Sequence, residues 1–66
     1  MLKLKCTQSF QIDQLTYIIE GEVWGVQCID KGIVYITCLH GINLGLELEL
    51  DLESISEFFK VMDAQL

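Results

Sequence analysis

The chain has 66 residues, 52% of them hydrophobic, and a formal net charge of −6 at neutral pH. This length accommodates one domain, which buries only about 60% of the surface that the unfolded chain exposes. Ten acidic residues against four lysines disfavour direct binding to nucleic acid or to an anionic membrane, because both require clustered basic residues. Such acidity suits a partner protein with a basic surface, or it serves only solubility.

The cysteine content and the N-terminal residues bear on the cellular location. Residues 1–5 alternate apolar and charged side chains and lack the apolar stretch of a secretory signal. No run approaches the ~18 apolar residues of a membrane span. Three cysteines, an odd number, are typical of a reducing compartment in such a chain. We therefore expect a cytoplasmic protein.

The first third of the chain contains two predicted strands and an ambiguous connection. Residues 2–6 alternate apolar and polar side chains, which is typical of a half-buried strand. Residues 7–14 fit either a single helical turn or an irregular extension of that strand, and Phe10 and Ile12 are their apolar anchors. Residues 15–19 predict a second strand, which a tight turn joins to the next element.

Residues 23–39 predict a β-hairpin, because two runs of β-branched and aromatic residues flank the turn-forming residues 30–32. A three-residue loop that ends at Gly32 pairs Ile29 with Ile33. A two-residue loop would distribute the main apolar side chains over both faces, so the three-residue loop is the predicted one. Because side chains alternate along a strand, this register places six of them on one face: Trp24, Val26, Cys28, Val34, Ile36 and Cys38.

Residues 43–50 alternate leucine with glycine or glutamate and predict another strand. A loop at residues 39–41, ending in glycine like the preceding one, sets Leu44 beside Ile36. The leucines then extend the apolar face of the hairpin.

From residue 54 the apolar period changes from two to about 3.6 residues, which predicts one amphipathic helix at the end of the chain. Ser54 is the predicted N-cap, with Glu57 completing a capping box, and Asp51 is the competing cap one turn earlier. The apolar stripe of this helix consists of Ile55, Phe58, Phe59, Met62 and Leu66.

The predicted fold class is α+β, in a single small domain over residues 1–66. It consists of an antiparallel β-meander of four to five strands with one C-terminal amphipathic helix packed on one face. A small SH3-like barrel with a terminal helix is the alternative. That barrel requires the first strand to pair with a later one.

One helix covers one face of the predicted sheet, and the opposite face is unusually apolar. An exposed apolar patch of this kind usually marks an interface, and a homodimer is the simplest arrangement because a twofold axis brings the patch against itself. The alternatives are coverage by the N-terminal segment and a different protein partner. The predicted interface residues are Val23, Ile29, Ile33, Tyr35 and Leu39.

The residue types that serve catalysis or metal binding do not occur at productive spacings. No Cys-x-x-Cys pair is present, and the predicted register separates Cys28 from Cys38 by roughly 13 Å along the strands, too far for a disulfide or a shared metal. Cys38 and His40 are two residues apart, but no third group orients the histidine. We therefore expect no enzymatic activity, no metal site and no cofactor.

The main functional pattern is a row of carboxylates along residues 47–53. Residues two apart on a strand lie about 6.6 Å apart on one face, which resembles the regular charges of a nucleic-acid strand. Such a row fits an inhibitor or modulator that blocks a basic, nucleic-acid-binding surface of another protein. The alternatives are protection of the sheet edge with solubility, and a homo-oligomeric structural subunit. The predicted acidic interaction surface comprises Glu47, Glu49, Asp51, Glu53, Glu20 and Glu22.

Overall fold

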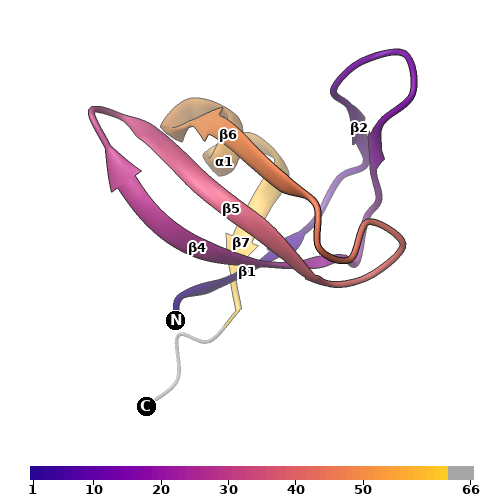
Figure 1. Cartoon of the computed structure of the whole chain (residues 1–66), viewed down its shortest axis with the longest axis horizontal. Coiled ribbons are helices and arrows are strands. Elements are labelled where there is room, and N and C mark those ends of the chain that lie inside the picture. Colours follow the sequence, from indigo (N-terminus) through magenta and orange to yellow (C-terminus); the bar gives the residue numbers. More distant parts are fainter. Residues whose placement is uncertain (63–66) are drawn as a thin grey trace.

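A curved antiparallel sheet of five strands forms the body of the molecule, and a small hairpin projects from one end (Figure 1). The structure is a computed structural model and describes residues 1–62. Its elements are β1 (Lys3–Cys6), β2 (Phe10–Gln11), β3 (Tyr17–Ile18), β4 (Val23–Asp30), β5 (Ile33–His40), β6 (Glu47–Asp51), α1 (Leu52–Phe58) and β7 (Phe59–Val61). The spatial order of the large sheet is β6-β5-β4-β1-β7, and β2 pairs with β3. The predicted α+β class, with an antiparallel sheet and a C-terminal helix packed against it, is confirmed.

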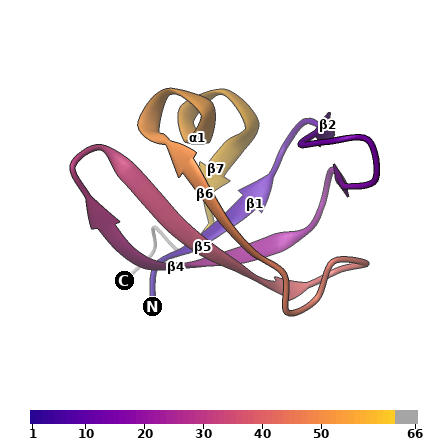
Figure 2. The same cartoon turned by 45° about the horizontal axis from the view of Figure 1, so that its top comes forward.

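The core lies on the concave face of the sheet, which we call the inner face. Trp24 is fully buried there and makes an edge-to-face contact with Phe59, with the ring centroids 6.4 Å apart. Ile55 and Phe58 of α1 pack against the same cluster, so the helix covers this face between β6 and β7 (Figure 2). The buried apolar residues are Leu4, Cys6, Ile18, Trp24, Val34, Ile36, Cys38 and Phe59.

The predicted terminal helix is too long, because α1 ends at Phe58 and the next three residues form β7. An extended backbone at Phe59 turns its ring into the core, where it is 6% exposed, and Phe58 stacks on Phe10 with centroids 4.2 Å apart. Adjacent aromatic side chains on a continuing helix would not both reach the core in this way. Met62 follows the strand and is exposed, and Leu66 lies outside the described residues.

The strand β7 pairs antiparallel with β1, as Cys6 opposite Phe59 and Leu4 opposite Val61 show. The first strand therefore pairs with a later one, which is the condition that the SH3-like alternative imposes. Between β6 and β7 the curved sheet is bridged by α1.

Asp51, the competing candidate, caps the helix in place of Ser54. Its carboxylate accepts a hydrogen bond of 2.7 Å from the Ser54 N–H, and this bond lowers the pKa of Asp51. Because β6 continues to Asp51, the helix begins directly at the end of the strand. The predicted cap at Ser54 is therefore wrong by one turn.

The β4–β5 hairpin turns through two residues, and the predicted three-residue loop is wrong. Lys31 and Gly32 both have positive φ, at 54° and 81°, as hairpin turns that match the strand twist require. A β-bulge between Val26 and Cys28 then restores the predicted register, with Val26 opposite Ile36. Five of the six predicted side chains consequently share the inner face, whereas Cys28 points to the opposite, outer face and is exposed.

The connection between β5 and β6 is longer than predicted and occupies residues 41–46. Ile36 lies opposite Leu48 rather than Leu44, a shift of four residues. The shift is even, so the leucines of β6 still face inward as expected. Leu44 instead remains in the loop with 70% of its surface exposed.

The ambiguous segment and the second predicted strand form the projecting hairpin. Only Tyr17 and Ile18 of residues 15–19 are in strand β3, which pairs with β2. Ile18 is buried in the core, Phe10 packs against it, and Ile12 is 38% exposed. The strand prediction is therefore right in type and too long.

Candidate functional site

The carboxylates of β6 point away from the core, toward the outer face of the sheet. Glu47, Glu49 and Asp51 are exposed and alternate with half-buried leucines. Their neighbours on β5 are Thr37, Tyr35 and Ile33, respectively. The side chains of Glu47 and Glu49 make no ion pair or hydrogen bond within residues 1–62. We call these three residues of β6 the acidic row.

A shallow hollow of about 430 Å³ lies beside the acidic row on the outer face. The amide of Gln27, at the bulge in β4, donates a hydrogen bond of 3.0 Å to the hydroxyl of Thr37 in the wall of the hollow. Its lining combines polar, acidic and aromatic side chains, with Gln27, Cys28, Tyr35, Thr37, Glu47 and Glu49 among the residues. Such a hollow is suited to a long side chain with a cationic end.

β6 is an edge strand, and its register shows which backbone groups face outward. Leu52 N–H donates to Gly32 C=O and Cys38 N–H donates to Leu46 C=O, so even-numbered residues of β6 hydrogen-bond to β5. In an antiparallel ladder the intervening residues point their backbone groups the other way. The N–H and C=O groups of Glu47 and Glu49 therefore face the open edge of the sheet.

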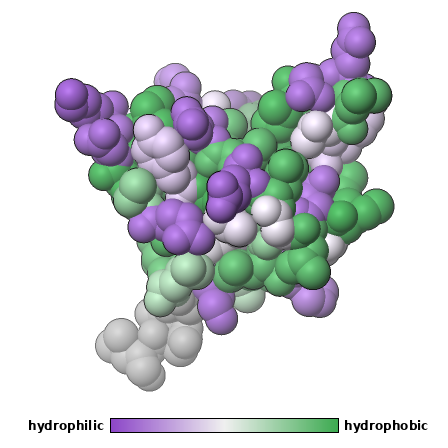
Figure 3. All heavy atoms as spheres, viewed as in Figure 1, coloured by the Kyte–Doolittle hydropathy of each residue, from purple (hydrophilic) through white to green (hydrophobic). Residues whose placement is uncertain are grey.

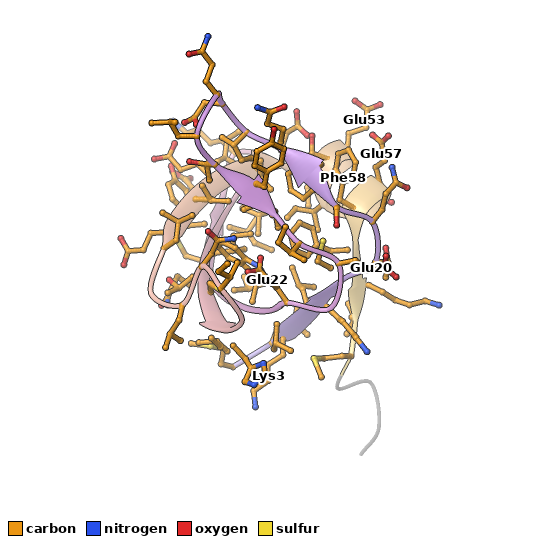
Figure 4. All side chains as sticks on the ribbon, turned by 90° about the vertical axis from the view of Figure 1, so that its right-hand side faces the viewer. Lys3, Glu20, Glu22, Glu53, Glu57 and Phe58 are labelled. Atoms are coloured by element: carbon orange, nitrogen blue, oxygen red, sulfur yellow. The ribbon has the colours of Figure 1, made fainter. Side chains whose placement is uncertain are left out.

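Two of the predicted acidic residues lie outside the acidic row but remain on the surface (Figure 4). Glu53 is in the first turn of α1, because the strand ends at Asp51 and the alternation stops there. Glu20 is exposed in the turn after β3. The structure therefore does not extend the row from Asp51 to Glu53 as the sequence predicts.

Glu22, predicted as part of the acidic surface, is buried at 3% exposure (Figure 4). Its carboxylate accepts hydrogen bonds from the Ile19 N–H at 3.1 Å, from the Asn43 N–H at 3.0 Å and from the Asn43 side-chain amide. That amide also donates to the Tyr17 carbonyl at 2.7 Å. Glu22 and Asn43 thus form a clasp that joins the β2–β3 hairpin to the β5–β6 loop, and the prediction of an exposed Glu22 is wrong.

The predicted apolar interface is less exposed and less continuous than expected. The bulge in β4 sets Ile29 opposite Val34 and so turns it to the other face. Val23, Ile33, Tyr35 and Leu39 are only half-exposed. The side chains of Met1 and Leu39 lie over Gly25 and cover the middle of this face. Lys3 and Lys5 face the same way, so the outer face is partly charged.

The most exposed apolar side chains occur instead on the two segments that the clasp joins. Leu15, at the hairpin tip, is 92% exposed, and Ile42 and Leu44 of the β5–β6 loop are 84% and 70% exposed. Figure 3 shows apolar surface over both segments. We define the two-loop patch as Tyr17, Ile19, Ile42 and Leu44. The sequence does not predict this patch. Its only signal there is the presence of apolar residues beside glycine turns.

The three thiols differ in environment. Cys6 and Cys38 are buried, and burial raises the pKa of both, with the nearby charge of Glu22 acting in the same direction. The Cys38 thiol donates to the His40 backbone carbonyl at 3.6 Å. Among residues 1–62 no three metal-ligating side chains lie close enough together to hold an ion.

A thiol-modifying reagent is expected to react rapidly with one cysteine of the folded protein. Cys28 is exposed, whereas Cys6 and Cys38 are shielded and their raised pKa disfavours the reactive thiolate. Counting released chromophore with an aromatic disulfide reagent at pH 8, before and after unfolding in guanidinium, measures this difference. A Cys28→Ser variant should lose the rapid phase, and rapid modification of a second thiol would contradict the burial of the other two.

The only helix within residues 1–62 has seven residues, too few to cross a membrane. The acidic row with its hollow and open strand edge is the candidate site, and Ile42 and Leu44 of the two-loop patch precede β6 in the chain. Comparison with protein-family models, curated proteins and solved structures finds no match to this chain.

Proposed function

We propose that the chain is a non-catalytic, cytoplasmic protein-binding module that occupies a basic, nucleic-acid-binding surface of a partner protein and so inhibits or modulates it. The observation that carries this proposal is the pair Glu47 and Glu49, exposed side by side on an edge strand with no partner for either carboxylate within residues 1–62. Carboxylates held in this way keep their full capacity to accept hydrogen bonds from lysine and arginine.

The distribution of charge on the outer face supports the same function. Three of the four lysines, Lys3, Lys5 and Lys60, lie on β1 and β7, at the opposite end of the strand order from the acidic row. Two strands, β5 and β4, therefore lie between the acidic row and the lysines of β1, and three lie between the acidic row and Lys60 of β7. With a net charge of −6, this polarity directs the acidic row toward a positive surface during encounter.

Charge reversal of the acidic row is expected to weaken competition with nucleic acid. A fluorescent single-stranded oligonucleotide is bound to a Lys/Arg-rich polypeptide, and its release by the wild-type chain is followed by anisotropy. The variant Glu47→Lys/Glu49→Lys should need about tenfold more protein for half release, because two favourable pairs become repulsive. The salt dependence of the competition should fall as well.

The matched control is Glu20→Lys/Glu57→Lys, which changes the net charge by the same amount at exposed positions away from the acidic row. It should compete nearly as well as the wild type. Equal losses in both variants would show that net charge alone is responsible and would contradict the proposal. Circular dichroism of both variants checks that the fold is retained.

Homo-oligomerisation is the second candidate, and the two-loop patch is the observation that favours it. Exposed apolar side chains of this size are typical of contact surfaces. If copies associate through the patch, Ile42→Glu/Leu44→Glu should convert a dimer to a monomer in light scattering. Ile29→Glu, at another exposed apolar position, is the control and should leave the mass unchanged. A wild-type monomer at high concentration would contradict this candidate.

A further inference from the structure

We infer that the open edge of β6 takes an extended segment of the partner as an added strand, with lysine or arginine at alternate positions. This inference rests on the proposed function, since it specifies how the acidic row meets a basic partner. Addition of a strand to a sheet edge is a known mode of peptide recognition, in which backbone hydrogen bonds supply affinity and alternate side chains supply specificity.

The backbone of β6 is free to form such a ladder. The N–H and C=O groups of Glu47 and Glu49 face outward, so they can donate and accept the backbone hydrogen bonds of an added antiparallel strand. β6 is paired with β5 without a register shift, whereas the β4–β5 ladder contains two. It also contains no proline. The bulges and prolines that commonly close a sheet edge are therefore missing from β6.

The side chains of β6 select the added strand. Directly opposite residues on neighbouring strands point to the same face, so alternate residues of the added strand would lie beside the carboxylates of Glu47 and Glu49. Cross-strand pairs of opposite charge are favourable and pairs of like charge are unfavourable. Two copies of β6 consequently repel each other, while a strand with basic residues at alternate positions is attracted.

The hollow on the outer face gives a long basic side chain a place to lie. Glu47 and Glu49 form one side of the hollow, and the ring of Tyr35 and the hydroxyl of Thr37 belong to the neighbouring strand β5. A lysine or arginine that extends over the edge strand can pack its methylene groups against these side chains while its charge meets a carboxylate. The hollow therefore favours a basic side chain held in a fixed position on a strand over a cationic surface without such order.

The opposite edge of the sheet is not equivalent. β7 has three residues, and its Lys60 lies directly opposite Lys5 of β1. A basic segment would meet two like charges there and is repelled. The acidic row and the β7 edge of a second copy are complementary in sign, so self-association is an outcome that the experiment must separate from peptide binding.

The test uses the full chain and blocked peptides of alternating lysine and valine, with affinities measured by calorimetry. A peptide of the same composition with its lysines in one block is the first control. Two further peptides are variants of the alternating peptide. One carries backbone N-methyl groups on its lysines, and the other carries them on its valines. In an added strand only one of these two sets of N–H groups faces β6.

The alternating peptide should bind at least tenfold more tightly than the block peptide, and N-methylation should cost about tenfold on one set of residues only. Equal binding of the alternating and block peptides, or equal effects of the two methylated peptides, would overturn strand addition while leaving the proposed function in place. If the variant Glu47→Lys/Glu49→Lys binds the alternating peptide as tightly as the wild-type chain does, the proposed function itself is overturned. A dimer of the peptide-free chain that Glu47→Lys/Glu49→Lys dissociates would assign the edge to a second copy and overturn the inference.

Discussion

Replacement of Glu22 by alanine should lower the free energy of unfolding by about 3 kcal/mol. The carboxylate is 3% exposed and accepts hydrogen bonds from the backbone N–H groups of Ile19 and Asn43 and from the Asn43 side chain. Its removal leaves these donors, which are partly buried, without their charged acceptor. Urea unfolding followed by tryptophan fluorescence measures the loss.

The control for this prediction is Glu20→Ala, two residues away and exposed. A surface substitution of this kind changes the stability by less than about 0.5 kcal/mol. Glu22→Gln should be intermediate, because its single carbonyl oxygen can accept from one side of the clasp while its amide opposes the remaining donors. Similar stabilities of the alanine variants at the two positions would contradict the role of the clasp.

Replacement of Trp24 by alanine should cost about 4 kcal/mol of stability, the largest loss expected for a single side chain here. The side chain is fully buried and contacts Phe59 edge-to-face, and its volume cannot be refilled in a core of this size. Guanidinium unfolding followed by circular dichroism measures the change, since the variant contains no tryptophan.

Trp24→Phe provides the informative comparison. The indole N–H of Trp24 is buried and finds no hydrogen-bond partner within the described part of the chain. Phenylalanine retains an aromatic ring and removes this unsatisfied donor, whose burial is itself costly. We therefore expect a loss of only about 1 kcal/mol, since the smaller ring and the lost donor have opposing effects. A loss as large as that of the alanine variant would contradict this expectation.

Much of the sheet could be predicted because side-chain alternation reports which face is buried. Trp24, Val26, Ile36 and Cys38 share the inner face as expected, even though the predicted turn was one residue too long. The two errors cancelled: the shorter turn moves the register by one residue and the bulge moves it back. Alternation carries no signal for a bulge, so Cys28 and Ile29, which lie between the turn and the bulge, were assigned to the wrong faces.

The acidic row could be predicted for the same reason, since Glu47 and Glu49 alternate with leucines that face the core. Glu22 could not. A glutamate beside a turn glycine ordinarily lies in solvent, and its partner Asn43 is 21 residues away. The two-loop patch depends on that same long-range contact. Local patterns do not report which loops meet, and the features that need two distant segments were therefore missed.

The pairing of β1 with β7 has a consequence for how the chain folds. Thr7 and Phe58, 51 residues apart, are joined by a hydrogen bond from the Thr7 N–H to the Phe58 carbonyl. The β4–β5 hairpin can form locally, but β1 gains its second neighbour and Phe59 enters the core only when the two end segments meet. Contacts of such sequence separation place folding on the order of milliseconds to seconds rather than microseconds. Until closure, the edge of β1 and the apolar surface around Trp24 are open, and this interval is when the chain is most prone to aggregation.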